Sequence, residues 1–117
     1  MSGNNFLLDT NIVLYLLNGD TTLRDLLHEK ALYFSFITEI ELLGYHKLSV
    51  KEKHIIKEFI DDVIVIDMNA EIKKHAINIR NHYNVKLGDC LIAATAMYAG
   101  IPFITSDKGF NKKKESI

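Results

Sequence analysis

Four acidic residues stand where short apolar runs of the sequence end or where an apolar helical segment begins. Asp9 directly follows the run at residues 6–8, and Glu41 lies one helical turn beyond a second run. Asp107 comes shortly after the last run, and Asp89 opens the most apolar helical segment. Two carboxylates about 5 Å apart repel by about 3 kcal/mol at an effective dielectric constant of about 20. A cluster of four therefore requires either a divalent cation or protonation of some of its members.

All four candidate ligands offer oxygen atoms, and no cluster of histidine or cysteine competes with them. Oxygen ligands favour Mg²⁺ or Mn²⁺ over zinc. A cation held by carboxylates, with positions left open for water, can activate a water molecule and clamp a phosphodiester. The pattern thus predicts hydrolysis of phosphodiester bonds.

Each of these acids also has a purely structural interpretation. Asp9 would cap a helix that starts just after it, and Glu41 would complete a capping box with Thr38. Asp89 would favour the positive end of a helix dipole, and Asp107 would form a turn. The functional interpretation therefore depends on the four acids meeting in one place.

The elements that must position these acids are four short apolar runs alternating with helical segments. The predicted strands are residues 6–8, 32–37, 63–66 and 102–105. Continuous apolar runs are typical of parallel strands that are covered on both faces. Predicted helices begin at the Ser49-x-x-Glu52 capping box, at Asn69 and near Asp89, and the last of them ends at Gly100. Right-handed crossovers then predict an α/β fold, a three-layer α/β/α sandwich around a small parallel sheet of four or five strands.

Composition indicates one globular domain over residues 1–117, with residues 112–117 forming a loose polar tail. The net charge of −1 excludes a broadly basic nucleic-acid-binding coat and leaves room for a local basic patch. The single cysteine, Cys90, excludes an internal disulfide and fits a reducing compartment. We expect its thiol to pack in a helix rather than to react. The first residues lack a basic segment, so we expect no signal peptide and no membrane span. This predicts a cytoplasmic location.

Four segments of the sequence, in order, resemble the motifs of PIN-domain ribonucleases of the VapC toxin type. The segments are residues 7–12 (LLDTNI), 37–43 (ITEIELL), 88–96 (GDCLIAATA) and 104–110 (ITSDKGF). The resemblance spans residues 5–110, nearly the whole chain. It implies a PIN-like fold and an endoribonuclease that uses Mg²⁺ or Mn²⁺ and a metal-activated water.

By this resemblance, the catalytic acids and metal ligands would be Asp9, Glu41, Asp89 and Asp107. Asn11 and Ser106, the hydroxyl residue before the last acid, would have supporting roles. Glu41 is assigned rather than Glu39 because the family acid precedes a Leu-Leu segment, and Glu39 stays the alternative.

The resemblance also implies substrates and partners. Members of this family cleave single-stranded or loop RNA and leave a 5′-phosphate and a 3′-hydroxyl, so transfer or ribosomal RNA would be the target. A cognate antitoxin would silence the enzyme, and the chain would form a homodimer.

Three other functions compete with this one. Residues 63–67 resemble the phosphoacceptor strand of a response-regulator receiver domain, with Asp67 as the acceptor. A receiver needs paired acids after its first strand, where this chain has only Asp9 with Asn11 nearby. A phosphatase of the haloacid dehalogenase type would require a second acid two residues after Asp9, where this chain has Asn11. The other alternative is a catalytically silent PIN-like interaction module, against which the presence of all four acids argues.

Overall fold

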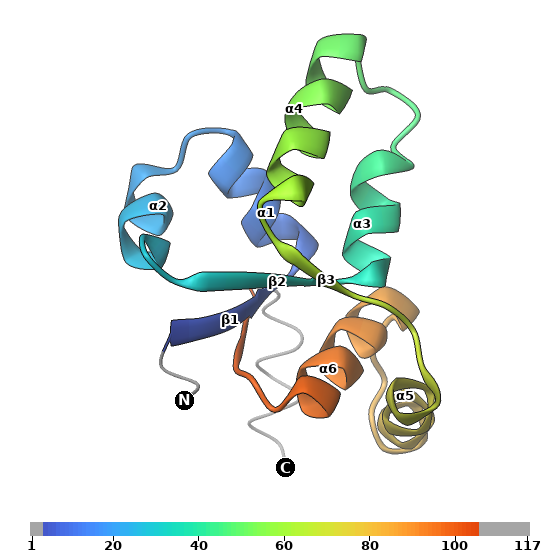
Figure 1. Cartoon of the computed structure of the whole chain (residues 1–117). Helices are drawn as coiled ribbons and strands as arrows, with labels where there is room; N and C mark the ends of the chain where they lie inside the picture. Colours follow the sequence, from blue (N-terminus) through green and yellow to red (C-terminus); the bar gives the residue numbers. More distant parts are fainter. Residues whose placement is uncertain (1–3, 106–117) are drawn as a thin grey trace.

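A parallel sheet between two layers of helices forms the body of the computed structural model, which describes residues 4–105 (Figure 1). The strands are β1 (Asn5–Leu8), β2 (Ala31–Ser35), β3 (Ile64–Ile66) and β4 (Phe103–Ile104). The helices are α1 (Thr10–Leu17), α2 (Thr21–Leu27), α3 (Phe36–Leu43), α4 (Val50–Asp61), α5 (Ala70–His82) and α6 (Leu87–Ala99). The four strands lie in the order β3-β2-β1-β4, and every pair is parallel. The predicted three-layer sandwich is confirmed, with four strands among the described residues.

Both faces of the sheet are covered, as the continuous apolar runs predicted. Helices α1 to α4 lie over one face, and α5 and α6 lie over the other (Figure 1). Leu7 and Leu8 are neighbours in β1 and point to opposite faces, yet neither is exposed. Leu8 packs in the core under α1 to α4, and Leu7 packs against α6. Full burial of each of these side chains contributes roughly 1.5–3 kcal/mol.

The second strand ends two residues earlier than predicted. Ser35 ends β2 and caps α3, because its hydroxyl accepts a hydrogen bond from the Ile37 amide at 3.2 Å. Helix α3 therefore begins at Phe36, and Thr38 lies inside it. The predicted capping box between Thr38 and Glu41 is consequently wrong, since the cap is three residues upstream of Thr38.

The predicted helix ends at Ser49, Asn69 and Gly100 are confirmed. The Ser49 hydroxyl accepts from the Glu52 amide at 3.0 Å, and the Glu52 carboxylate accepts from the Ser49 amide at 2.9 Å. This backbone hydrogen bond lowers the pKa of Glu52 below its usual value. Asn69 caps α5, and Gly100 ends α6 at a φ of 68°, in the left-handed region that favours glycine.

Some predictions fall beyond these residues. The polar tail at 112–117, Ser106 and Asp107 all lie outside the described part of the chain. Within residues 4–105, no helix combines the length and apolar character needed to cross a membrane.

Candidate active site

Asp9 lies at the carboxyl end of β1 and is held by two different elements. It caps α1, because its Oδ1 accepts a hydrogen bond from the Ile12 amide at 2.9 Å. Its Oδ2 accepts a hydrogen bond from the hydroxyl of Thr105, which follows β4. The residue is only 5% exposed. The predicted capping role is therefore confirmed, but it accounts for one carboxylate oxygen only.

Glu41 joins this edge of the sheet from α3. Its Oε1 accepts a hydrogen bond from the Thr10 hydroxyl at 2.5 Å, so the residue next to Asp9 contacts the second predicted acid. A second hydrogen bond joins the Thr10 and Thr38 hydroxyl oxygens, which are 3.3 Å apart. Thr38 is fully buried, whereas Glu41 is exposed. The contact from Thr10 supports Glu41 over Glu39 as the acid of α3.

Asp89 lies in the first turn of α6, where it is half-buried. The residue before it, Gly88, lies against the Glu41 carboxylate. A Cβ atom placed on Gly88 would stand 3.2 Å from Glu41 Oε2, closer than an ordinary van der Waals contact. The absence of a side chain at Gly88 thus allows the start of α6 to approach Glu41.

Contacts between side chains and backbone therefore bring together the elements that carry the first three acids. Asp9 contacts the end of β4, its neighbour Thr10 contacts Glu41, and Glu41 lies beside Gly88, the neighbour of Asp89. Asn11 is exposed in the first turn of α1. Within residues 4–105, no three side chains of His, Cys, Asp or Glu are grouped so that they could hold a metal ion by themselves.

The donor atoms at this edge suit a hard divalent cation. They are carboxylate oxygens, and a carboxylate that accepts one or two hydrogen bonds retains further lone pairs. Asp9 and Glu41 are also oriented by their hydrogen bonds to Ile12, Thr105 and Thr10. The chemistry of these oxygen donors fits Mg²⁺ or Mn²⁺.

The sequence alone did not predict the contacts made by three residues, which are Thr10, Gly88 and Thr105. A signal for Thr105 was available in the pairing of β1 with β4, because Leu8 pairs with Ile104 and the next residues are Asp9 and Thr105. The Asp9 amide also donates to the Ile104 carbonyl at 3.1 Å. The resemblance implied a supporting role for Ser106, which lies outside the described residues.

Cys90 is packed in the core between α5 and α6, away from solvent. Its thiol donates a hydrogen bond to the Ala76 carbonyl oxygen at 3.2 Å. Burial raises the pKa of the Cys90 thiol, and the charge of Arg80 offsets this in part. A neutral, buried thiol agrees with the packing role expected for it.

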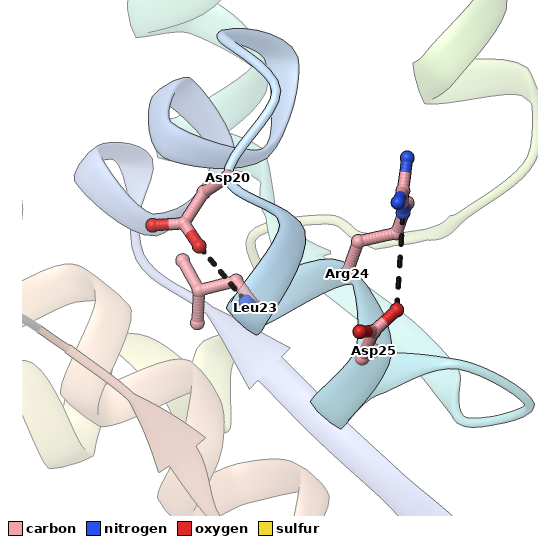
Figure 2. A network of polar contacts seen from close by, with 4 residues as sticks. All are labelled: Asp20, Leu23, Arg24 and Asp25. Atoms are coloured by element: carbon pink, nitrogen blue, oxygen red, sulfur yellow. Dashed lines mark hydrogen bonds and ion pairs between the residues drawn. The ribbon is translucent and has the colours of Figure 1, made fainter.

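A separate cavity of about 630 Å³ opens between α1, α2, β2 and α4. Its lining is largely apolar, with Arg24 and Asp62 among its polar members, and includes none of the predicted acids. Near it, Asp20 caps α2 by accepting from the Leu23 amide at 3.0 Å (Figure 2). Arg24 and Asp25 form an exposed ion pair at 4.0 Å, a kind of contact that contributes little to stability (Figure 2).

Asp67 follows β3 on an exposed edge of the sheet. Strand β2 lies between β3 and β1, so Asp67 is separated from Asp9 by a whole strand. In a flavodoxin-like sheet such as that of a receiver, the third strand lies directly beside the first. The receiver interpretation is therefore wrong in its strand order.

Comparisons with known proteins agree on the kind of domain. The PIN domain family model matches residues 6–116. A toxin-antitoxin complex from Klebsiella pneumoniae contains a chain that is 26% identical, with a TM-score of 0.78, over 89% of this chain and 88% of that one. VapBC2 from Rickettsia felis, bound to a DNA fragment from their promoter, gives 20% identity, a TM-score of 0.78 and coverages of 93% and 92%. VapBC-1 from nontypeable Haemophilus influenzae gives 23% identity and a TM-score of 0.76, over 97% of this chain and 94% of that one. No curated protein sequence matches the chain significantly.

Proposed function

The chain belongs to the PIN-domain family, and we propose that it is a divalent-metal-dependent endoribonuclease that serves as the toxin of a toxin-antitoxin pair. The observation that carries the nuclease proposal is the contact of Thr10, the neighbour of Asp9, with Glu41, which itself lies beside Gly88, the neighbour of Asp89. These contacts bring the elements that carry the three acids to one edge of the sheet, which supports the proposal. The toxin role is supported by the similarity to a chain of the Klebsiella pneumoniae toxin-antitoxin complex.

We propose that Asp9, Glu41, Asp89 and Asp107 hold Mg²⁺ or Mn²⁺. When bound, such a cation supplies activation of water as a nucleophile and neutralisation of phosphate charge. Its double charge also offsets the repulsion among the carboxylates. Asn11 and Ser106 keep the supporting roles that the resemblance implies.

The protein's own contribution is to fix the carboxylates before substrate arrives. Asp9 is held through both oxygens, one by the Ile12 amide and one by the Thr105 hydroxyl. Glu41 is held through Oε1 by Thr10. The free-energy cost of reorganisation during reaction is smaller for ligands that are already fixed by outer hydrogen bonds. Both acids are thus oriented before any cation or RNA binds.

The proposed reaction is hydrolysis of an RNA phosphodiester. The oxygen of water bonds to phosphorus, the bond from phosphorus to the 3′-oxygen breaks, and the 3′-oxygen takes up a proton. The products are a 5′-phosphate and a 3′-hydroxyl. Single-stranded loops of transfer or ribosomal RNA are the proposed substrates, because their unstacked bases and backbone are accessible. We also propose a cognate antitoxin, a homodimer and a cytoplasmic location.

The proposal is tested by cleavage of end-labelled single-stranded RNA by the purified chain, free of any partner protein, in Mg²⁺, Mn²⁺ or EDTA. The informative variant is Asp9→Asn, because asparagine caps a helix about as well as aspartate, while it removes the charge and the oxygen that accepts from Thr105. Asp20→Asn is the matched control, since Asp20 caps α2 with the same geometry on an exposed surface. We expect Asp9→Asn to lower cleavage by roughly a hundredfold or more and Asp20→Asn to leave it unchanged.

The outcomes separate the competing functions. Cleavage that persists in EDTA, or equal cleavage by wild type and Asp9→Asn, would overturn the metal-dependent mechanism. A folded wild type that cleaves no RNA with either cation would favour the catalytically silent interaction module. Mapping of the 5′-phosphate at the cut ends checks the direction of bond breakage.

A further inference from the structure

We propose that Thr10 is a positioning residue, which orients the Glu41 carboxylate through its hydroxyl and is itself braced by Thr38. The proposal rests on the nuclease function given above and extends it to a residue outside the acid set. Thr10 Oγ1 donates to Glu41 Oε1 at 2.5 Å and lies 3.3 Å from Thr38 Oγ1. Thr10 thus connects the start of α1 to α3.

Glu41 needs such a contact because its side chain is exposed and long. A glutamate on a helix surface can rotate about three side-chain bonds, so its carboxylate samples many positions unless a partner holds it. The hydrogen bond from Thr10 fixes Oε1, and the close approach of Gly88 limits where Oε2 can lie. The two contacts act on different oxygens of one carboxylate and together define its position.

Thr38 stabilises the position of Thr10. Thr38 is fully buried, so bulk water does not compete for its hydroxyl. Thr38 lies one turn before Glu41 on the same helix. The bond between the Thr10 and Thr38 hydroxyls therefore fixes Thr10 relative to the helix that carries Glu41.

The chain contains an internal comparison for Thr10. Thr21 follows the cap Asp20 and begins α2, as Thr10 follows the cap Asp9 and begins α1. Thr21 is exposed. In the part of the chain that the structure describes, the hydroxyl of Thr10 contacts an acid of another element, and no such contact is found for Thr21. The helix-starting role is common to both residues, and the contact with Glu41 is particular to Thr10.

The experiment compares Thr10→Val, which keeps the shape but loses the hydroxyl, with Thr10→Ser, which keeps the hydroxyl. Thr21→Val is the matched control for replacing a threonine at the first position of a helix. Binding of Mn²⁺ alone is measured by isothermal titration calorimetry without RNA, together with kcat/KM for RNA cleavage and the thermal unfolding midpoint. Removal of an outer hydrogen bond to a metal ligand typically costs 10- to 100-fold in affinity or activity. We expect a loss of about that size for Thr10→Val, recovery within about threefold for Thr10→Ser, and no change for Thr21→Val.

A second arm tests that the effect runs through Glu41. In a Glu41→Gln background, Thr10→Val should cause no further loss of Mn²⁺ affinity, because its target has already lost its charge. Thr10→Ala replaces Thr10→Val if the latter does not fold. Wild-type Mn²⁺ affinity and kcat/KM in a folded Thr10→Val chain would overturn the positioning role while leaving the nuclease proposal intact. A wild type that neither binds Mn²⁺ nor cleaves RNA would instead overturn the nuclease proposal, and this inference with it.

Discussion

Asp9 and Asp20 cap their helices through the same hydrogen-bond pattern, yet among the described residues only Asp9 also receives a hydrogen bond from Thr105, the residue after β4. Oδ1 of Asp9 accepts from the Ile12 amide at 2.9 Å, and Oδ1 of Asp20 accepts from the Leu23 amide at 3.0 Å. Figure 2 shows the contact of Asp20. Asp9 is 5% exposed and Asp20 is on the surface. Burial of a carboxylate is costly, and an exposed aspartate caps a helix without that cost. Helix capping therefore explains Asp20 and leaves the burial of Asp9 to another role.

The first prediction decides between the two acids of α3. Glu41→Gln keeps an oxygen that can accept from Thr10 and removes the charge, whereas Glu39→Gln makes the same change two residues earlier. We expect Glu41→Gln to lower RNA cleavage by roughly a hundredfold or more, because charge stabilisation through a metal is worth several kcal/mol. Cleavage assays at saturating Mn²⁺ check this. A larger loss for Glu39→Gln than for Glu41→Gln would reverse the assignment.

The second prediction concerns Gly88. Alanine at this position brings a Cβ to 3.2 Å from Glu41 Oε2, and the carboxylate is the flexible end of a side chain that can move away. The fold should tolerate the change, since alanine is favoured over glycine in a helix by about 1 kcal/mol. We expect an unfolding midpoint that is unchanged or raised and a loss of cleavage of about tenfold.

Gly100→Ala is the control for Gly88→Ala, and we expect it to lower stability without lowering cleavage. Gly100 ends α6 at a φ of 68° with open space around it, so alanine there strains the backbone without touching an acid. Stability should fall by about 1 kcal/mol while cleavage by the folded protein is retained. Reduced cleavage by Gly100→Ala and full cleavage by Gly88→Ala would contradict the role assigned to the Gly88 contact.

The third prediction concerns the pH dependence that comes from Cys90. Burial raises the pKa of this thiol in the folded chain, so the unfolded chain loses its thiol proton at a lower pH than the folded chain does. The contribution of the thiol to stability is therefore fully present below the ordinary cysteine pKa and is lost as the pH rises through the raised pKa of the folded chain. Chemical denaturation between pH 7 and 10, compared with Cys90→Ala, measures the difference. A stability difference that increased with pH would have the wrong sign.

The same burial governs the reactivity of Cys90. Alkylation requires the thiolate and access to reagent, and the folded chain provides neither. We expect iodoacetamide to modify the native chain at least about a thousandfold more slowly than the unfolded chain, in line with typical folding equilibria. Mass spectrometry follows the reaction. Rapid modification of the native chain would show that Cys90 is accessible.

The sequence predicted most of the architecture because its signals are local. The capping box at Ser49 and Glu52, the cap at Asn69 and the stop at Gly100 each depend on a few neighbouring residues, and all three are confirmed. The end of β2 was misplaced because residues 32–37 are apolar almost throughout, and only the side chain of Ser35 marks where the strand becomes a helix.

The candidate site was harder to predict in detail because its contacts join residues far apart in the chain. Asp9 and Thr105 are 96 positions apart, and Thr10 and Glu41 are 31 apart. Types and positions of acids identified the edge of the sheet, but hydrogen bonds between side chains depend on strand register and on helix orientation. Register alone would have favoured Thr105 over Ser106 beside Asp9.

The hydrogen bond from Thr105 to Asp9 also orders events during synthesis of the protein. Asp9 emerges from the ribosome early, whereas β4 and Thr105 follow all six helices described here. A nascent chain that ends before residue 103 has its first acid but lacks the strand that holds it. During translation, Asp9 therefore lacks one of the two hydrogen bonds that orient it until β4 has joined the sheet.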